Sequence, residues 1–307
     1  MTSCRICLES LRGESQYHAH CLRSLFGKGK APILEIEVSK LHTAALAMVG
    51  HTSLSGIQKK ISVNLSADRE TLTVAAEGGL YILKPQAGTY PALPENEQVT
   101  TLIAKLIGIN VAPAGLISLK DDTLAYIVQR FDRLPEDGKV RQEDFCQLAE
   151  QPPKDKYDGS AELCMRLIKK YASEPLIEIR KLYKLLVFCW WSGNGDMHLK
   201  NFSLLTDTDG ITRLTPAYDL LCTQLVIPDD PLALPVIGKK TRLRRGDWLK
   251  LAEYCKLPAK VAGQILEEQA EATEDAKQLI TKSFLSEDQK NLYKEIIASN
   301  AQTLLGN

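Results

Sequence analysis

The chain has 307 residues, with 38 Lys and Arg against 38 Asp and Glu, so its formal net charge is zero. This balance excludes a protein that coats nucleic acid by charge alone, and no apolar run reaches the roughly 18 residues that a membrane span requires. The length predicts two lobes with a sizeable core. The amino terminus is polar and has no apolar signal core, so we expect a cytoplasmic protein without a disulfide framework.

The first 21 residues carry a cysteine and histidine cluster that predicts a metal knuckle. A Cys-x-x-Cys pair is followed by a His-x-x-Cys pair, which together supply three thiolates and one imidazole, a complete tetrahedral set for zinc. We choose His18 over His20 because His18 and Cys21 repeat the spacing of the first pair. The alternative is a set of free thiols in a frayed terminus. The predicted structural zinc ligands are Cys4, Cys7, His18 and Cys21.

The next hundred residues predict a strand-rich lobe. Ile33 to Val49 predict a strand followed by a short helix. Apolar spacing of three and four predicts an amphipathic helix over residues 95–107, which Gly108 ends. Alternating apolar residues predict a half-buried strand over residues 61–65, and further apolar segments predict strands over residues 72–75, 81–84, 114–119 and 124–129.

The remainder of the chain predicts a helical lobe. A β-hairpin is expected over residues 202–215, and helices over 143–150, 162–171, 178–191 and from 247 onward. We therefore predict an α+β, two-lobed, protein-kinase-like fold. Its parts would be a knuckle over residues 1–28, an amino-terminal lobe over 29–130 and a helical lobe over 131–307.

The densest polar cluster follows the apolar helix that ends at Trp191. Asp196 and Asn201 have the Asp-x-x-x-x-Asn spacing of a kinase catalytic loop, and Asp219 follows the predicted hairpin as a second metal-binding acid would. In that arrangement Asp196 is the catalytic base, Asn201 and Asp219 hold Mg²⁺, and Lys200 neutralises the transferred phosphoryl group. A hydrogen-bonded turn is the structural alternative.

The strand-rich lobe should then supply a nucleotide clamp. Lys84 ends a predicted strand, where a lysine can pair with phosphates, and Glu95 or Glu97 could be its partner. A polar loop over residues 53–60 precedes the strand, and Gln129 with Phe131 lies at the lobe junction. No Walker A pattern is present, which argues against a P-loop enzyme.

Five motifs, in order along the chain, resemble the HipA family of serine/threonine kinase toxins from bacterial toxin–antitoxin modules. The resemblance covers about residues 30–260. It is closest to the short HipT type, which lacks an amino-terminal subdomain of the long members. The motifs are Gly56-Ile57-Gln58-Lys59-Lys60, Gln129-Arg130-Phe131-Asp132-Arg133, Glu143-Asp144-Phe145-Cys146-Gln147, Asn194 to Asn201 and Pro216-Ala217-Tyr218-Asp219.

The resemblance implies an ATP site and a regulatory loop. Gln129 and Phe131 would contact adenine through backbone groups, and Ser53 or Ser55 would be autophosphorylated, placing negative charge beside the ATP phosphates. A flexible polar turn is the alternative for these serines. The implied ATP-site residues are Lys84, Gln129, Phe131, Gln147, His198, Asn201, Tyr218, Asp219, Ser55, Gly56, Gln58 and Lys59.

The resemblance also implies partners. The cofactors would be ATP and Mg²⁺, and the substrate an aminoacyl-tRNA synthetase, whose phosphorylation inhibits translation. Small HipS-like and DNA-binding HipB-like antitoxins would bind the chain, with DNA reached only through the antitoxin. Two other functions stay open: an ATP-binding regulator that transfers no phosphate, and a small-molecule kinase. The basic run over residues 239–245 is a docking site for substrate or antitoxin, or else a solvated turn.

Overall fold

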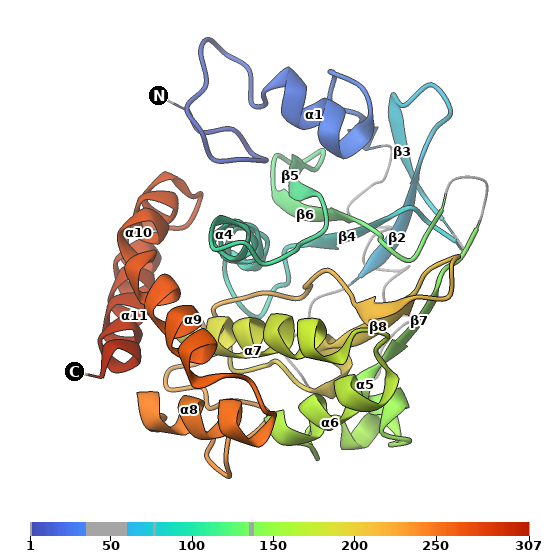
Figure 1. The fold of residues 1–307 in the computed structure, drawn as a ribbon. Coiled ribbons are helices and arrows are strands. Elements are labelled where there is room, and N and C mark those ends of the chain that lie inside the picture. Colours follow the sequence, from blue (N-terminus) through green and yellow to red (C-terminus); the bar gives the residue numbers. More distant parts are fainter. Residues whose placement is uncertain (1, 35–59, 76–77, 135–137, 307) are drawn as a thin grey trace.

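The computed structural model describes residues 2–34, 60–75, 78–134 and 138–306 (Figure 1). Strands dominate the first part of the chain and helices the second, which confirms the predicted α+β class. Within the described residues, no helix combines the length and apolarity that a membrane crossing needs.

A mixed six-stranded sheet forms the first lobe. Its strand order is β1-β3-β2-β4-β6-β5, and every neighbouring pair is antiparallel except β1 with β3. The strands expected between residues 61 and 129 are all present. Their bounds are β1 (Ile33–Leu34), β2 (Ile61–Leu65), β3 (Thr71–Val74), β4 (Tyr81–Pro85), β5 (Ala114–Ser118) and β6 (Leu124–Gln129).

Side chains of β4 alternate between an apolar core on one face of the sheet and the candidate site on the other. Tyr81 and Leu83 belong to a core cluster that also holds Leu25 and Phe26 of helix α1 (Ala19–Phe26). The Tyr81 hydroxyl donates to the Leu25 carbonyl oxygen at 2.9 Å and closes this face. Because side chains alternate along a strand, Lys84 points to the opposite face, where the candidate site lies.

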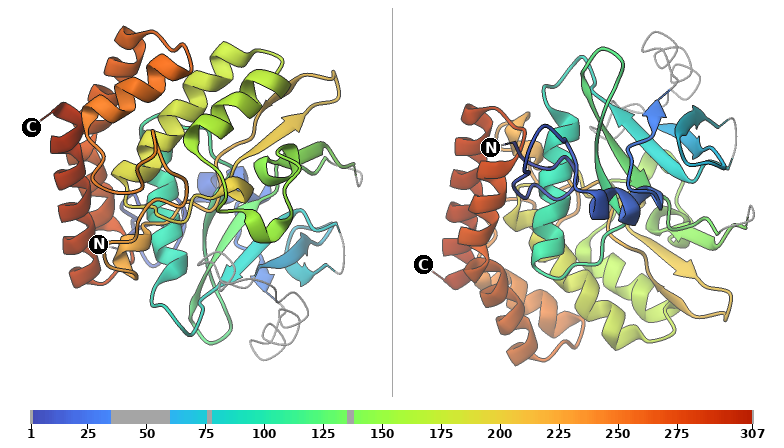
Figure 2. Two further views of the ribbon diagram at one scale, coloured as in Figure 1. Left: turned by 90° about the horizontal axis from the view of Figure 1, so that it is seen from below. Right: turned by 90° about the horizontal axis from the view of Figure 1, so that it is seen from above.

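Helices make up most of the second lobe. Helix α7 (Pro175–Trp191) lies in the middle, and the carboxy-terminal helices pack along one side of it (Figures 1 and 2). The largest core cluster joins these helices through residues such as Tyr183, Trp191 and Ile297. The others are α5 (Phe145–Leu148), α6 (Ala161–Tyr171), α8 (Arg245–Tyr254), α9 (Ala259–Glu271), α10 (Thr273–Lys282) and α11 (Glu287–Leu305).

Helix α4 (Leu93–Leu106) lies between the sheet and the helical lobe (Figure 1). Val99 and Ile103 belong to the core cluster of the helical lobe, although α4 falls inside the predicted amino-terminal lobe. The helix also packs against β5 and β6. Gly108 follows its end with a φ of 78°, the left-handed conformation that favours glycine after a helix. Helix α4 therefore packs against both lobes.

The region after Asp132 differs from the prediction. A helix was expected over residues 143–150, but β7 (Arg141–Asp144) pairs with β8 (Ser203–Thr206), and α5 begins only at Phe145. With β9 (Thr212–Leu214) these strands form a second, three-stranded sheet. Asp144 ends the strand and caps α5 by accepting a hydrogen bond from the Gln147 N–H. The capping box, rather than the apolar pattern, sets the start of the helix.

Candidate active site

Three buried charged residues meet where the two lobes face each other. The Lys84 ammonium group on β4 pairs with the Glu97 carboxylate on α4. It also lies 2.5 Å from Oδ1 of Asp219, which follows β9. All three side chains are buried, so these charges balance each other rather than being solvated. Of the two glutamates proposed as partners, Glu97 makes the contact.

The electrostatics of this cluster favour an ionised Asp219. Burial alone would raise the pKa of Asp219, but the Lys60 and Lys84 ammonium groups hold it far below its usual range. Burial would likewise lower the pKa of Lys84, yet Asp219 and Glu97 raise it. The pKa of Glu97 is raised because its carboxylate is fully desolvated. Asp219 is therefore a fixed negative charge, the group that a divalent cation requires.

Lys60 is a member of this site to which sequence analysis gave no role, although it ends the first of the five family motifs. Its Nζ lies 2.6 Å from Oδ2 of Asp219, so each carboxylate oxygen of Asp219 has one ammonium partner. Asp219 has a φ of 55°, which is unfavourable for a residue with a Cβ. The two ion pairs hold the side chain in place despite this conformation.

Asp196 lies in a loop that is otherwise closed to solvent. Of residues 191–199, all are buried except Asp196, which is half-buried. The Tyr157 hydroxyl donates to Oδ1 of Asp196 at 2.8 Å, and the Asn194 side chain accepts from the Asp196 N–H at 3.2 Å. A rigid loop therefore presents one carboxylate at an accessible position, as a catalytic base requires.

Hydrogen bonds join the Asp196 loop to the Asp219 loop. The Asn201 side chain donates to the Asp196 carbonyl oxygen at 3.0 Å. The Tyr218 hydroxyl donates to the Lys200 carbonyl oxygen at 3.0 Å, and Asn194 Nδ2 lies 3.5 Å from the Asp219 carbonyl oxygen. The last two contacts hold the Asp196 loop against the segment that carries Asp219, and the first fixes Asn201 within the Asp196 loop. An amide oxygen and a carboxylate are the hard donors that Mg²⁺ prefers.

Two further lysines lie beside Asp196. Lys200 pairs with Asp144 at 3.0 Å and is about one third exposed (37%). Lys156 is buried, and its ammonium group lies 5.1 Å from the centre of the Tyr157 ring. Burial, together with Lys200 and Lys60, lowers the pKa of Lys156, while Asp196 opposes that shift. Lys156 is thus the lysine whose charge Asp196 stabilises, while the charge of Lys200 is balanced by Asp144.

A cavity of about 180 Å³ opens beside the charged cluster at the lobe junction. Ile82 and Val128, which are paired across β4 and β6, form an apolar wall, as a nucleobase would need. The Phe131 and Tyr218 rings also line the cavity, and their centres lie 5.8 Å apart. Gln129 also lines the cavity, but its N–H donates to the Pro113 carbonyl oxygen at 2.9 Å, so this N–H is not available for an adenine contact.

Two of the expected ATP-site residues, Gln147 and His198, do not line this cavity. Gln147 is exposed and accepts from the Asp144 N–H at 2.9 Å, so it caps α5 instead of lining the cavity, whereas Gln142 does line it. His198 is buried against Tyr157, and within the described part of the chain neither of its ring nitrogens has a hydrogen-bond partner. Burial, helped by nearby Lys156, lowers the pKa of His198 to about 4. The expected loop residues Ser53, Ser55, Gly56, Gln58 and Lys59 lie outside the described residues.

The four predicted zinc ligands converge at the amino terminus. The ligand atoms of Cys4, Cys7, His18 and Cys21 all lie within 4.8 Å of one another. His18 Nε2 lies 3.2 Å from the Ser10 carbonyl oxygen, and an N–H on Nε2 would donate to it. Nδ1 then carries no hydrogen and faces the thiols, with Cys7 Sγ 3.4 Å away. This second contact fixes the ring as in many zinc sites. The set fits a tetrahedral metal.

The fold and the site define a two-lobed protein of the kinase-like class, with a lysine–glutamate pair and two loop acids at the lobe junction. Residues 52–277 match the family described as HipA-like C-terminal domain. This match covers well over half of the chain, so the chain belongs to that family, as the motifs indicated.

Relatives in sequence carry the name "Putative kinase". The chain is 34% identical to Y4mE of Sinorhizobium fredii over 209 residues, which are 66% of this chain and 47% of that protein. Identity to Y4dM of the same organism is 37% over 189 residues, 56% of this chain and 45% of the relative. The chain therefore spans about half the length of these two relatives. A Haemophilus influenzae relative is 28% identical over 277 residues, covering 83% of this chain and 80% of its own length.

Solved structures support the same fold. HipA of Shewanella oneidensis, in a complex with HipB and operator DNA, superposes with a TM-score of 0.72 at 21% identity, over 83% of this chain and 65% of that one. The Helicobacter pylori proinflammatory kinase CtkA gives a TM-score of 0.52 at 15% identity, over 76% of this chain and 91% of that one. At these identities the likeness concerns the fold.

Proposed function

We propose that this chain is an ATP-dependent kinase that phosphorylates serine or threonine in a protein, acting as the toxin of a bacterial toxin–antitoxin module. One observation carries the proposal: Lys84, Glu97 and Asp219 form a single ion-paired cluster beside the loop that presents Asp196. Phosphoryl transfer needs this combination of a phosphate-binding cation, a metal-binding acid and a base. The family membership supports it.

In the proposed reaction Asp196 accepts the proton of the substrate hydroxyl as its oxygen attacks the γ-phosphorus. The bond from that phosphorus to the β,γ-bridging oxygen breaks, and ADP leaves with the bond electrons. Tyr157 orients Asp196 through its hydrogen bond, and Lys84 binds the phosphates. Mg²⁺, when bound to Asn201 and Asp219, would neutralise the phosphate oxygens. Lys200 and Lys156 add positive charge beside the transferred group.

The substrate and partners of the proposal come from the family resemblance. The substrate would be an aminoacyl-tRNA synthetase, whose phosphorylation inhibits translation. The structural relative HipA is seen with HipB and operator DNA, which supports a HipB-like antitoxin here, and a HipS-like partner is proposed on the resemblance to the short type. Autophosphorylation at Ser53 or Ser55 belongs to the same proposal. We also propose Zn²⁺ as the metal of the amino-terminal knuckle, because three thiolates and an imidazole select it.

The test is transfer of labelled phosphate from ATP to a bacterial lysate. The natural chain is compared with Asp196→Asn and with the matched control Asp209→Asn, which changes an exposed carboxylate in the turn between β8 and β9. We expect the natural chain and the control to label one protein band, with a synthetase identified by mass spectrometry, and Asp196→Asn to label none. Nucleotide binding without any transfer, or label only on small molecules, would overturn the proposal.

A further inference from the structure

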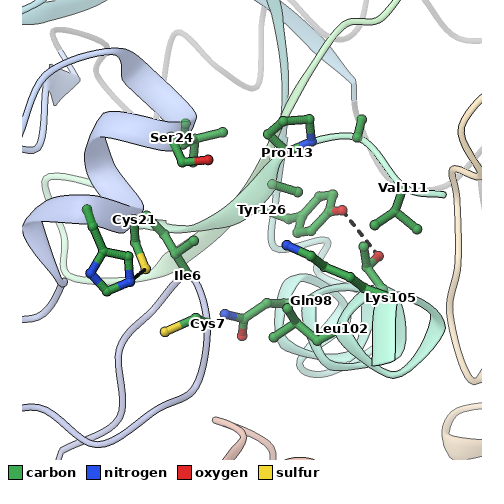
Figure 3. Close-up of a pocket in the computed structure, with 15 residues that line it drawn as sticks. Ile6, Cys7, Cys21, Ser24, Gln98, Leu102, Lys105, Val111, Pro113 and Tyr126 are labelled. Atoms are coloured by element: carbon green, nitrogen blue, oxygen red, sulfur yellow. Dashed lines mark hydrogen bonds between the residues drawn. The ribbon is translucent and has the colours of Figure 1, made fainter. Parts of the chain in front are cut away.

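The amino-terminal knuckle touches helix α4 at a carbonyl group that lies between two metal ligands. Gln98 of α4 donates its side-chain N–H to the Arg5 carbonyl oxygen at 2.6 Å, and the Leu116 N–H of β5 donates to the same oxygen at 2.8 Å. Figure 3 shows the Gln98 side chain extending from α4 toward the loop that carries Cys7. One carbonyl of the Cys4–Cys7 turn therefore connects α4 with the sheet.

Gln98 immediately follows Glu97, the partner of Lys84. Consecutive residues of a helix point about 100° apart, so α4 directs Glu97 into the candidate active site and Gln98 toward the knuckle. Both side chains are almost fully buried. A rotation of α4 that broke the Gln98 contact would therefore also move Glu97 away from Lys84.

Other contacts hold the knuckle against the same surface. Leu8, directly after Cys7, is fully buried in the core cluster that contains Val99 and Ile103 of α4, and it keeps a φ of 61° to do so. Ile6 packs so closely on β5 that a Cβ at Gly115 would lie 2.7 Å from Ile6 Cγ1. The knuckle is thus fitted to its position rather than loosely attached.

Only a thin layer separates the knuckle from the candidate active site. A cavity of about 280 Å³ lies between the knuckle, α4 and β5 (Figure 3). Thr101, Ala112 and Tyr126 line both this cavity and the one at the lobe junction. The Tyr126 and Thr101 hydroxyl groups lie 3.3 Å apart, and Lys84 Nζ lies 5.6 Å from the centre of the Tyr126 ring. A change on the knuckle side therefore has a short path to Lys84.

Among the described residues before α1 there is no helix and only one isolated backbone bridge, between Ser3 and Ser10. Such a segment loses much conformational entropy when it is ordered, and a bound metal can supply the free energy. We propose that zinc binding by Cys4, Cys7, His18 and Cys21 fixes α4, so that the metal state of the knuckle controls the Glu97–Lys84 pair and nucleotide binding. The nucleotide part of this inference rests on the proposed function, while the metal and helix parts do not.

The first experiment measures zinc in the purified chain by mass spectrometry. We expect one zinc per chain in the natural protein. The matched pair is His18→Gln and His20→Gln, since His20 stacks on His18 and also approaches Cys21. His18→Gln removes a direct ligand and should lower the zinc content clearly below one per chain, whereas His20→Gln should retain it. No zinc in any preparation, or equal loss in both variants, would overturn the proposed site.

The second experiment removes zinc from the natural chain with a chelator and then restores it. Amide hydrogen exchange in α4 should become about tenfold faster without zinc and recover on its return, while α11 should not respond. Gln98→Leu should keep its zinc and still exchange faster in α4. Affinity for a fluorescent ATP analogue should fall in parallel. Unchanged α4 exchange after zinc removal would refute the coupling. If α4 responds but the zinc-loaded chain binds no nucleotide, the proposed function fails and the zinc coupling stands.

Discussion

Replacing Asp219 with asparagine would remove the one negative charge that two lysines share. Lys60 and Lys84 lie 2.6 and 2.5 Å from its two oxygens, and Lys84 and Asp219 are both almost fully buried. Removing one member of a buried ion pair costs about 3 to 5 kcal/mol. In this variant Lys84 still pairs with Glu97, and the ammonium group of Lys60, which is 38% exposed, can be solvated by water. We therefore expect a loss of stability at the lower end of this range, about 3 kcal/mol.

The matched variant is Asp196→Asn, in which the same chemical change is made at a half-buried carboxylate. Asparagine can still accept from the Tyr157 hydroxyl through its carbonyl oxygen, so stability should change by less than about 1 kcal/mol. Both variants should lose at least about 10²-fold in phosphoryl transfer, because one lacks the metal ligand and the other the base. The assays are urea denaturation followed by tryptophan fluorescence, and transfer of labelled phosphate.

The pH dependence gives a further check on the Asp219 variant. Since the pKa of Asp219 is held far below its usual range in the folded chain, its stabilising contribution is present above about pH 4 and is lost as the pH falls further. The difference in stability between the natural chain and Asp219→Asn should therefore shrink below about pH 4. Equal stabilities at pH 7 would refute the view that this carboxylate holds the two lysines.

Three further predictions concern His198, Glu97 and the basic run. Burial lowers the pKa of His198 from 6.5 to about 4. As the pH falls from 6.5 to 4, His198 is therefore protonated in the unfolded chain before it is protonated in the folded chain, and the free energy of unfolding should fall by about 3 kcal/mol. His198→Phe should flatten that profile in denaturation curves, and an unchanged profile would contradict the assignment. Glu97→Gln should lower transfer about 10²-fold with a raised KM for ATP, since Lys84 loses a partner; unaltered kinetics would exclude the pairing role. In the basic run, Lys239 pairs with Asp247 and Arg245 pairs with Glu267. Charge reversal of Lys240, Arg242 and Arg244 should therefore be what weakens the binding of an acidic partner, measured by calorimetry. If binding is unchanged, the run is a solvated turn.

The parts of the fold that followed from sequence are those set by local patterns. Alternation over residues 61–65 predicted β2, and the apolar segment over residues 81–84 predicted β4 with Lys84 near its end. The three-four spacing predicted α4, and Gly108 its end. Each of these signals acts between near neighbours along the chain, where propensity and burial agree.

The parts that sequence missed depend on contacts between distant residues. Lys60 pairs with Asp219 across 159 positions, and Tyr157 reaches Asp196 across 39. Nothing in the local pattern around either residue indicates such a partner. The start of α5 is different, because Asp144 and Gln147 have the spacing of a capping box, with Asp in place of the usual Ser or Thr. That signal was in the sequence and would have assigned Gln147 to the cap.

The two acids of the site are held in opposite ways, and the difference fits their proposed roles. Asp219 is buried, and each of its carboxylate oxygens has an ammonium partner, so its charge is fixed and it cannot take a proton near neutral pH. Asp196 is half-buried, and Tyr157 engages one of its oxygens. A metal ligand must remain charged throughout a reaction, whereas a base must reach a substrate and accept its proton. Exchanging these environments would disable both groups, so the position of each acid in the fold determines its chemistry as much as its residue type does.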